Sequence, residues 1–241
     1  MTAHSLPRGR LSTILVWLLG AQCVVAAATV PALLQEASQL DLVNESVWWT
    51  DELPDEHWVL STAEIVWPLL FTATMVLWLV WQYRGQATLV SAGVDGLRFT
   101  PTWAVLWWFI PFANLGYPAS VTGELLRGAE VGPGSRANEM PSSALVLPWW
   151  VPLMVGLVTA SVGMQLRTAY RSVRGIRIDP GLIATGDRAL VASSIALAIA
   201  APLAIAIVLR VERLMSRWSA DAIASPARPD ASPPPTRPDV V

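Results

Sequence analysis

Lysine is absent from the sequence, cysteine occurs once and histidine twice, and these shortages exclude several kinds of site. All 16 basic residues are arginine, so no lysine is present to form a phosphate-binding P-loop. Cys23 lies in an apolar run without a disulfide partner, and we interpret it as a small buried hydrophobe. His4 and His57 lie in a tail and a loop, and no metalloprotease or serine-hydrolase motif occurs. We therefore expect no catalytic residue, no cofactor, no metal and no nucleic-acid partner.

Charge is scarce as well. Charged residues make up 14% of the chain, against about a quarter in ordinary soluble domains. Hydrophobic residues make up 54%, the mean hydropathy is +0.48, and the apolar residues form long runs that are typical of membrane proteins. The arginine-only basic residues and the abundance of Ala, Val, Pro, Gly and Trp favour a GC-rich bacterial genome. We therefore expect a protein of the bacterial inner membrane.

Four uncharged runs predict membrane-spanning helices, because about 20 helical residues cross a hydrocarbon core of about 30 Å. The first run is an alternative candidate for a signal peptide, but it is longer than the usual apolar region of one, and we favour a retained helix. Arg8 and Arg10 place residues 1–10 in the cytosol. The predicted fold class is an all-α polytopic transmembrane helical bundle, with a membrane domain at 11–218 and spans at about 11–32, 61–83, 145–166 and 189–209.

The remaining segments differ in composition. Residues 35–60 contain seven acidic residues and no arginine, which predicts an acidic external loop without the spacing of a calcium site. Ser61 and Glu64 have the spacing of a capping box, so we expect the second helix to begin there. Residues 219–241 are rich in Pro, Ala and Ser and are expected to be disordered.

The segment 96–118, "GLRFTPTWAVLWWFIPFANLGYP", is apolar but unlike a regular span. Pro111 and Pro118 each remove a helical hydrogen-bond donor, and Asn114 adds an amide that needs partners. The segment therefore either crosses as a fifth span or enters the membrane and returns. The distribution of arginines is equal for the two arrangements, so the positive-inside rule does not decide between them.

A resemblance to a known family favours the arrangement in which the segment 96–118 enters the membrane and returns. The stretches "WQYR" (81–84) and "GLRFTPTWAVLWWFIPFANL" (96–115) resemble a family of bacterial membrane proteins known only as domain of unknown function 4328. The resemblance covers about residues 60–215 and is specific at 81–115. In such proteins basic residues flank the motif on both sides, which implies that the segment returns to the cytosol. The present chain departs from the family after Asn-Leu, where it has Gly116, Tyr117 and Pro118.

Two sets of candidate functional residues follow. The first belongs to a re-entrant or interfacial segment at about 101–120, which either lines a polar cavity or lies at headgroup depth. Its residues are Arg98, Trp103, Trp107, Pro111, Asn114 and Pro118. The second set consists of arginines at helical spacing, which we interpret as lipid-headgroup contacts. These are Arg167, Arg171, Arg174, Arg210, Arg213 and Arg217.

Small residues at helical spacing in the last two spans predict close helix packing, within the chain or between copies. They are Gly156, Ala160 and Gly163, then Ala192, Ala196, Ala200 and Ala204. We expect a non-enzymatic scaffold that binds lipids or other membrane proteins. The alternative is a channel or transporter subunit with a polar route near Pro111 and Asn114.

Overall fold

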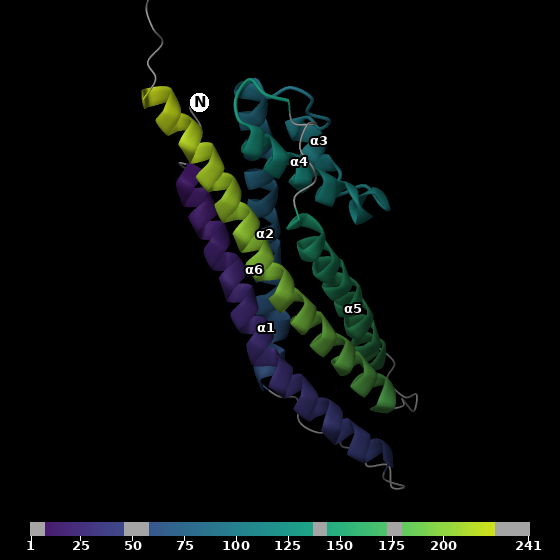
Figure 1. Cartoon of the computed structure of the whole chain (residues 1–241). Helices are drawn as coiled ribbons and strands as arrows, with labels where there is room; N and C mark the ends of the chain where they lie inside the picture. Colours follow the sequence, from purple (N-terminus) through teal and green to yellow (C-terminus); the bar gives the residue numbers. More distant parts are fainter. Residues whose placement is uncertain (1–7, 46–57, 137–143, 173–179, 225–241) are drawn as a thin grey trace, which may run out of the picture.

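The computed structural model describes residues 8–45, 58–136, 144–172 and 180–224 (Figure 1). These residues form helices, with one isolated β-bridge between Asp95 and Arg136. The predicted all-α class is confirmed. The tail 219–241 lies mostly outside the described residues, and α6 continues into its first part as far as Ala224.

Four helices are long and apolar enough to cross a membrane. They are α1 (Arg8–Glu45), α2 (Trp58–Ser91), α5 (Val146–Ser172) and α6 (Pro180–Ala224). Each extends beyond its uncharged run, because polar residues at the ends of a helix leave the hydrocarbon while the backbone hydrogen bonds continue. The predicted start of α2 at Ser61 is wrong, since the helix begins at Trp58 and the supposed capping pair lies inside it.

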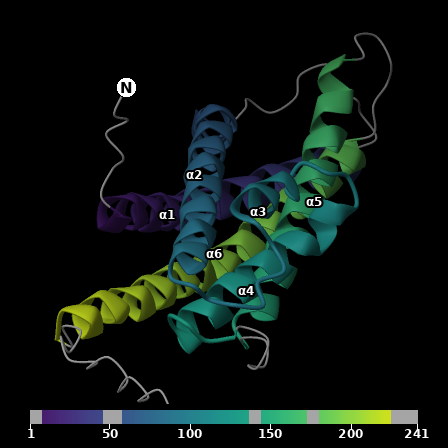
Figure 2. The same cartoon turned by 90° about the horizontal axis from the view of Figure 1, so that it is seen from above.

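The four long helices alternate in direction (Figure 1). α1 and α6 pack along each other, α2 packs on α1, and α5 packs on α6 (Figures 1 and 2). The short helices α3 (Pro101–Leu106), η1 (Ala113–Leu115) and α4 (Tyr117–Val131) all lie between α2 and α5 in sequence. They gather at one end of the bundle, which we call the α4 end (Figure 1). The opposite end, where Glu64 lies, is the Glu64 end.

The segment 96–118 forms no helix of spanning length. α3 has six residues, about 9 Å of helix, and turns follow it before η1 begins. Phe112 in this stretch has a positive φ of 62°, which is rare for a residue with a side chain. Pro118 is the second residue of α4, where a missing amide hydrogen costs no helical bond. The described residues thus contain no fifth helix of spanning length, and the predicted set of four such helices is confirmed.

The small residues of α5 and α6 face each other within the chain. A Cβ atom added to Gly163 would lie 2.7 Å from the carbonyl oxygen of Gly186. Ser193 donates a hydrogen bond of 2.8 Å to the carbonyl of Gly156. The predicted close packing is thus found between α5 and α6. Gly156 and Gly163 make their close contacts with α6 of the same chain.

One proline in α6 receives an unusual compensation. Pro202 cannot donate to the carbonyl of Ala198, which is the helical acceptor four residues earlier. The thiol of Cys23 in α1 donates to this carbonyl instead, at 3.9 Å. The single cysteine is therefore half-buried between helices, in agreement with its interpretation as a packing residue.

Candidate functional site

A groove lies between α2 and α5, because these helices pack on α1 and α6 and make little contact with each other. It consists of two cavities. The Trp cavity, at the α4 end, has a volume of about 370 Å³, and the Glu64 cavity has about 340 Å³. Phe71, Leu157 and Ser161 line both, so the cavities adjoin. Val158 and Met164 at the rim are 58% and 41% exposed, so the groove opens toward the surface of the bundle.

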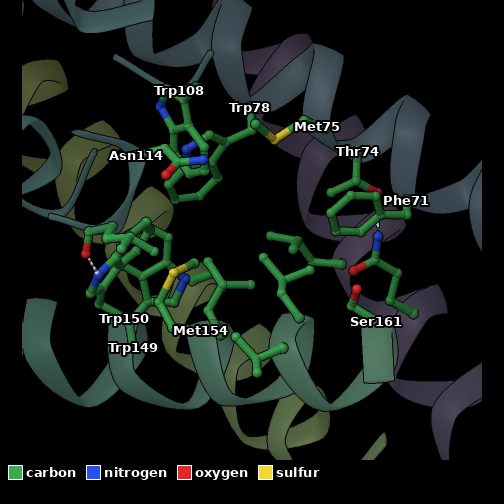
Figure 3. Close-up of a pocket in the computed structure, with 17 residues that line it drawn as sticks. Phe71, Thr74, Met75, Trp78, Trp108, Asn114, Trp149, Trp150, Met154 and Ser161 are labelled. Carbon is green, nitrogen blue, oxygen red and sulfur yellow. Dashed lines mark hydrogen bonds between the residues drawn. The ribbon is translucent and has the colours of Figure 1, made fainter. Parts of the chain in front are cut away.

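Tryptophans form one end of the Trp cavity (Figure 3). Trp78 of α2 stacks on Trp149 of α5 with ring centroids 5.1 Å apart, and Trp108 meets Trp150 edge to face at 5.8 Å. Trp108 donates to Gln82 at 2.8 Å, and Trp150 donates to the carbonyl of Leu115 at 2.9 Å. The indole nitrogen of Trp78 is buried without a hydrogen-bond partner among the described residues. These rings connect α2, α5 and the α3–η1 segment.

Asn114 lies at the same end, beside Trp108 and Trp78 (Figure 3). Its backbone amide donates to the carbonyl of Ile110 at 3.0 Å. Gln22 donates to Thr74 at 2.9 Å, so two further polar side chains of this cavity are paired with each other. Most other lining residues are apolar. Of the six candidate residues predicted in this segment, Asn114 is the one that lines the groove.

The Glu64 cavity combines charge with aromatic rings. Glu64 and Arg167 line it, together with Trp67 and Phe71. The rings of Trp67 and Phe71 are stacked, with centroids 5.1 Å apart and an interplanar angle of 9°. Pro68 and leucines from α1, α5 and α6 complete an apolar wall. This end of the groove therefore offers both a carboxylate and aromatic faces.

Arg167 is the centre of an ion cluster formed by all four spanning helices. Its guanidinium lies 3.2 Å from a carboxylate oxygen of Glu36 and 3.6 Å from one of Glu64, and it is bonded to Asp187. Glu36, Glu64 and Arg167 are each the first charge beyond the uncharged stretch of their helix, and Asp187 lies next to Arg188, which is the first charge beyond the stretch of α6. We call Glu36, Glu64, Arg167 and Asp187 the charge cluster. Arg188 of α6 forms a separate pair with Asp41 of α1 nearby.

The charge cluster corrects one prediction. Arg167 is 7% exposed and committed to carboxylates, so its assignment as a lipid-headgroup contact is wrong. The helical stripe was recognised from its spacing, but spacing does not show which neighbours a stripe faces. The side chain of Arg171 and all of Arg174 lie outside the described residues. Arg210 pairs with Glu130 at 2.7 Å, while Arg213 and Arg217 are exposed at the α4 end.

Among the residues that the structure describes, the charge cluster contains more carboxylates than guanidinium groups. One guanidinium faces three carboxylates, and Asp187 is 0% exposed with one carboxylate oxygen that has no hydrogen-bond partner among the described residues. Unbalanced charge is costly away from water, since several kcal/mol of hydration are lost per ion. The bonds of Arg167 to Glu36 and Asp187 therefore offset part of the cost of burying these charges.

A second polar network, which the sequence did not reveal, fixes the motif at 96–99. The carboxylate of Glu124 in α4 is 3% exposed and accepts hydrogen bonds from the backbone amides of Arg98 at 2.7 Å and Phe99 at 3.1 Å. Gln86 of α2 donates to the same carboxylate at 3.1 Å. Gln82, one turn earlier, donates to Thr122 at 3.1 Å. The signal that could have found this network is the pair of glutamines, Gln82 and Gln86, one helical turn apart at the end of a long apolar run.

Three other predicted residues, Arg98, Trp103 and Trp107, form a cluster around Tyr117. The Arg98 guanidinium lies over the Tyr117 ring at 5.9 Å, and Trp107 stacks on that ring with centroids 4.1 Å apart. Trp103 meets Trp107 at 5.2 Å. Pro111 is exposed, and Pro118 is buried at the start of α4. The structure thus separates these residues from Asn114, and they stabilise the segment rather than line the groove.

Comparison with known proteins gives a family but no function. The family model "Domain of unknown function (DUF4328)" matches residues 45–213, in agreement with the resemblance at 81–115. No curated protein and no solved structure matches the chain.

Proposed function

We propose that this chain, which belongs to the DUF4328 family of unknown function, is a non-catalytic membrane protein that binds an amphiphile in its groove. The observation that supports this proposal is the pair of adjoining cavities between α2 and α5. Each has a volume within the range of about 300–1,000 Å³ that is usual for small-molecule sites. Location in a bacterial inner membrane, with a cytosolic N-terminus, is part of the proposal.

The shape of the groove suits a long apolar chain. Glu64 and Trp78 mark its two ends on α2, and the helical rise between them is about 21 Å. The walls between these ends are mostly apolar, and the exposed rim belongs to helices that are long enough to span a membrane. An acyl chain in the groove would exchange lipid contacts for close packing, with polar groups available at both ends.

A scaffold role and an amphiphile-binding role are compatible, because a bound lipid can also join this protein to another. The alternative of a channel or transporter subunit is favoured by Asn114, which lies in the Trp cavity. The mostly apolar lining between Asn114 and the charge cluster supports chain binding better than a polar route for ions. A transport role would require polar groups along the whole path.

A filling substitution tests the proposal. Leu157 lines both cavities, and Leu157→Trp should block the groove by adding volume where the two cavities meet. Val155, on the same helix and 48% exposed, gives the control variant Val155→Trp. Purified protein is photocrosslinked in bilayers that contain a phospholipid with a diazirine in its acyl chain, and labelled positions are mapped by mass spectrometry.

We expect crosslinks at Met75 and Met154, which line the Trp cavity, in the natural protein and in Val155→Trp. Their yield should fall about tenfold in Leu157→Trp, which corresponds to a loss of about 1.4 kcal/mol in binding. Equal yields at these positions in both variants would show that the labelling comes from bulk lipid and would contradict a groove-bound chain.

A further inference from the structure

We propose that the bound amphiphile has an uncharged carbonyl group, which accepts a hydrogen bond from the side-chain amide of Asn114 in the Trp cavity. This inference rests on the proposed function, because the groove must first accept an apolar chain. It adds the chemistry of the polar end. Two classes of membrane lipid carry such a group on an apolar chain, the quinones as a ring carbonyl and the glycerolipids as an ester carbonyl.

The side-chain amide of Asn114 is an unused hydrogen-bonding group at the α4 end of the groove. Asn114 is half-buried and lines the Trp cavity, and its side chain makes no hydrogen bond with any residue that the structure describes. The other polar side chains of the lining are paired. Gln22 donates to Thr74 at 2.9 Å, and Ser161 accepts from Gln165 at 3.1 Å. A primary amide has two N–H donors, so Asn114 can donate to a ligand in the cavity.

Trp78 supplies a second unpaired donor at the same end, beside Asn114 (Figure 3). The indole N–H groups of Trp108 and Trp150 are both bonded within the chain. Trp78 is only 4% exposed, yet its indole nitrogen has no hydrogen-bond partner in the described part of the chain. Buried donors in proteins are normally paired, so the missing partner at this end is an acceptor. A carbonyl oxygen has two lone pairs and accepts up to two hydrogen bonds.

The lining of the Trp cavity favours an acceptor without charge. Among the described residues that line it, none is charged. A phosphate, carboxylate or ammonium inside the cavity would lose its hydration without meeting an opposite charge, which costs far more than burial of a neutral carbonyl. The stacked rings of Trp78 and Trp149 also present flat walls, which suit a planar group, and both a quinone ring and an ester are planar.

The position of Asn114 leaves the rest of the groove for the apolar tail. From the α4 end the wall continues past Met75 and Met154 to Phe71 and Leu157, which line both cavities. Both methionines are flexible and accommodate chains of different shape. An amphiphile bound in this direction has its polar end near one end of the spanning helices and its tail toward their middle, which is the orientation of a lipid in a bilayer.

The test uses the full-length protein in dodecylmaltoside micelles and tritium-labelled probes with tails of equal length. Two pairs isolate the carbonyl group, dodecylbenzoquinone against dodecylbenzene and methyl dodecanoate against dodecyl methyl ether. Ionised dodecanoate supplies a charged end. Binding to the immobilised protein is measured by scintillation proximity, with concentrations expressed as mole fractions within the micelle. Size-exclusion profiles confirm that every variant is folded.

We expect the natural protein to bind at least one carbonyl probe about tenfold more tightly than its carbonyl-free partner, a usual contribution of one hydrogen bond. The quinone pair and the ester pair distinguish the two lipid classes. Asn114→Leu, which replaces the amide by an apolar side chain of similar size, should abolish the preference and leave binding of the carbonyl-free probes unchanged. Trp78→Phe, which removes the second donor, should reduce the preference several-fold.

Gln165→Leu is the matched control for Asn114→Leu. It removes an exposed side-chain amide of α5 that lies outside both cavities, so the preference should remain as in the natural protein. A preference lost equally in Gln165→Leu and Asn114→Leu would overturn the inference, because the effect would not belong to the Trp cavity.

Three other results would also overturn it. Equal binding within both pairs, blocked by Leu157→Trp, would remove the carbonyl from the assignment and leave the proposed function intact. A preference that persists in Asn114→Leu would place the carbonyl elsewhere. Tighter binding of dodecanoate than of its methyl ester would show a site for an anion. Absence of binding by every probe would contradict the proposed function itself.

Discussion

Gly163 marks the closest approach of α5 and α6, and its substitution gives a prediction at the scale of one residue. A Cβ at this position would lie 2.7 Å from the backbone oxygen of Gly186, which cannot rotate away. We expect Gly163→Ala to lower the free energy of unfolding by about 1–3 kcal/mol, the usual cost of an overpacked contact. The measurement is thermal or denaturant unfolding of the purified protein in detergent.

Gly20 provides the control, because it lies in spanning helix α1 and a Cβ there would meet nothing within 4 Å. Gly20→Ala should leave stability unchanged or raise it slightly, since alanine favours a helix. If the two variants had the same stability, the α5–α6 contact would be looser than the structure indicates.

The environment of a residue could be predicted from the sequence only where its neighbours in the sequence determine that environment. Cys23 was recognised as a packing residue because an isolated thiol in an apolar run has few other roles. Arg167 was misassigned because its partners come from other helices, up to 131 positions away in sequence. Glu64 was assigned to a capping box with Ser61, because its contact with another helix could not be seen in the sequence. Its partner is Arg167, and no spacing rule connects α2 with α5.

At the scale of elements, the α3–α4 region depends on the Glu124 carboxylate. This group holds the backbone amides of Arg98 and Phe99, and Gln86 donates to it. In Glu124→Gln one acceptor oxygen becomes a donor that faces other donors. We expect a loss of about 1.5–3 kcal/mol, the usual contribution of hydrogen bonds to a charged group. Hydrogen exchange of the Arg98 and Phe99 amides should accelerate accordingly.

The control is Glu130→Gln in the same helix. Glu130 pairs with Arg210, whose side chain is 52% exposed, and such a pair contributes about 0–1 kcal/mol. It should leave exchange at 98 and 99 unchanged. Comparable acceleration in both variants would mean that the whole of α4 loosens, and that Glu124 has no special part in holding the motif.

Helices themselves were predictable, and their ends were not. The uncharged runs identified α1, α2, α5 and α6, because hydrocarbon requires continuous apolar helix. α4 was not predicted, since its sequence is neither apolar enough for a span nor distinctive alone. Ten of its residues are nevertheless buried, against α2, α5, α6 and η1. The family motif can be recognised in the sequence. Its hydrogen-bond partner Glu124 cannot, because nothing in the sequence around Glu124 indicates that it contacts the motif.

For the whole molecule, the arrangement of helices predicts sidedness. Reporters inserted after Gly134 and after Trp218 should lie on one side of the membrane, and a reporter after Glu45 on the other. Arg8 and Arg10 indicate that the shared side is the cytosol. Cysteine accessibility or enzyme-fusion reporters provide the measurement. Opposite sides for the positions after Gly134 and Trp218 would contradict a crossing of the membrane by both α5 and α6.

The groove was the part of the site that sequence could not supply. Its lining comes from α1, α2, α5, α6 and the α3–η1 segment. The sequences of these segments do not indicate that a cavity remains between them in the fold. Asn114 was selected because an amide in an apolar stretch needs a partner, and the structure places this residue in the lining of the Trp cavity. Trp67, Phe71 and Leu157 carry no such signal, since aromatic and leucine residues are common in any span.

The central position of α6 has a consequence for biosynthesis. α1 and α5 both present their main packing faces to α6, and Asp187 of α6 completes the partners of Arg167. A ribosome makes this helix last among the four, because chains emerge from the N-terminus. Until then α5 lacks its main partner and Arg167 lacks one of its carboxylates. The earlier helices are therefore incompletely packed until α6 has been made, and a nascent chain halted before α6 would expose the faces of α1 and α5 that the complete fold covers.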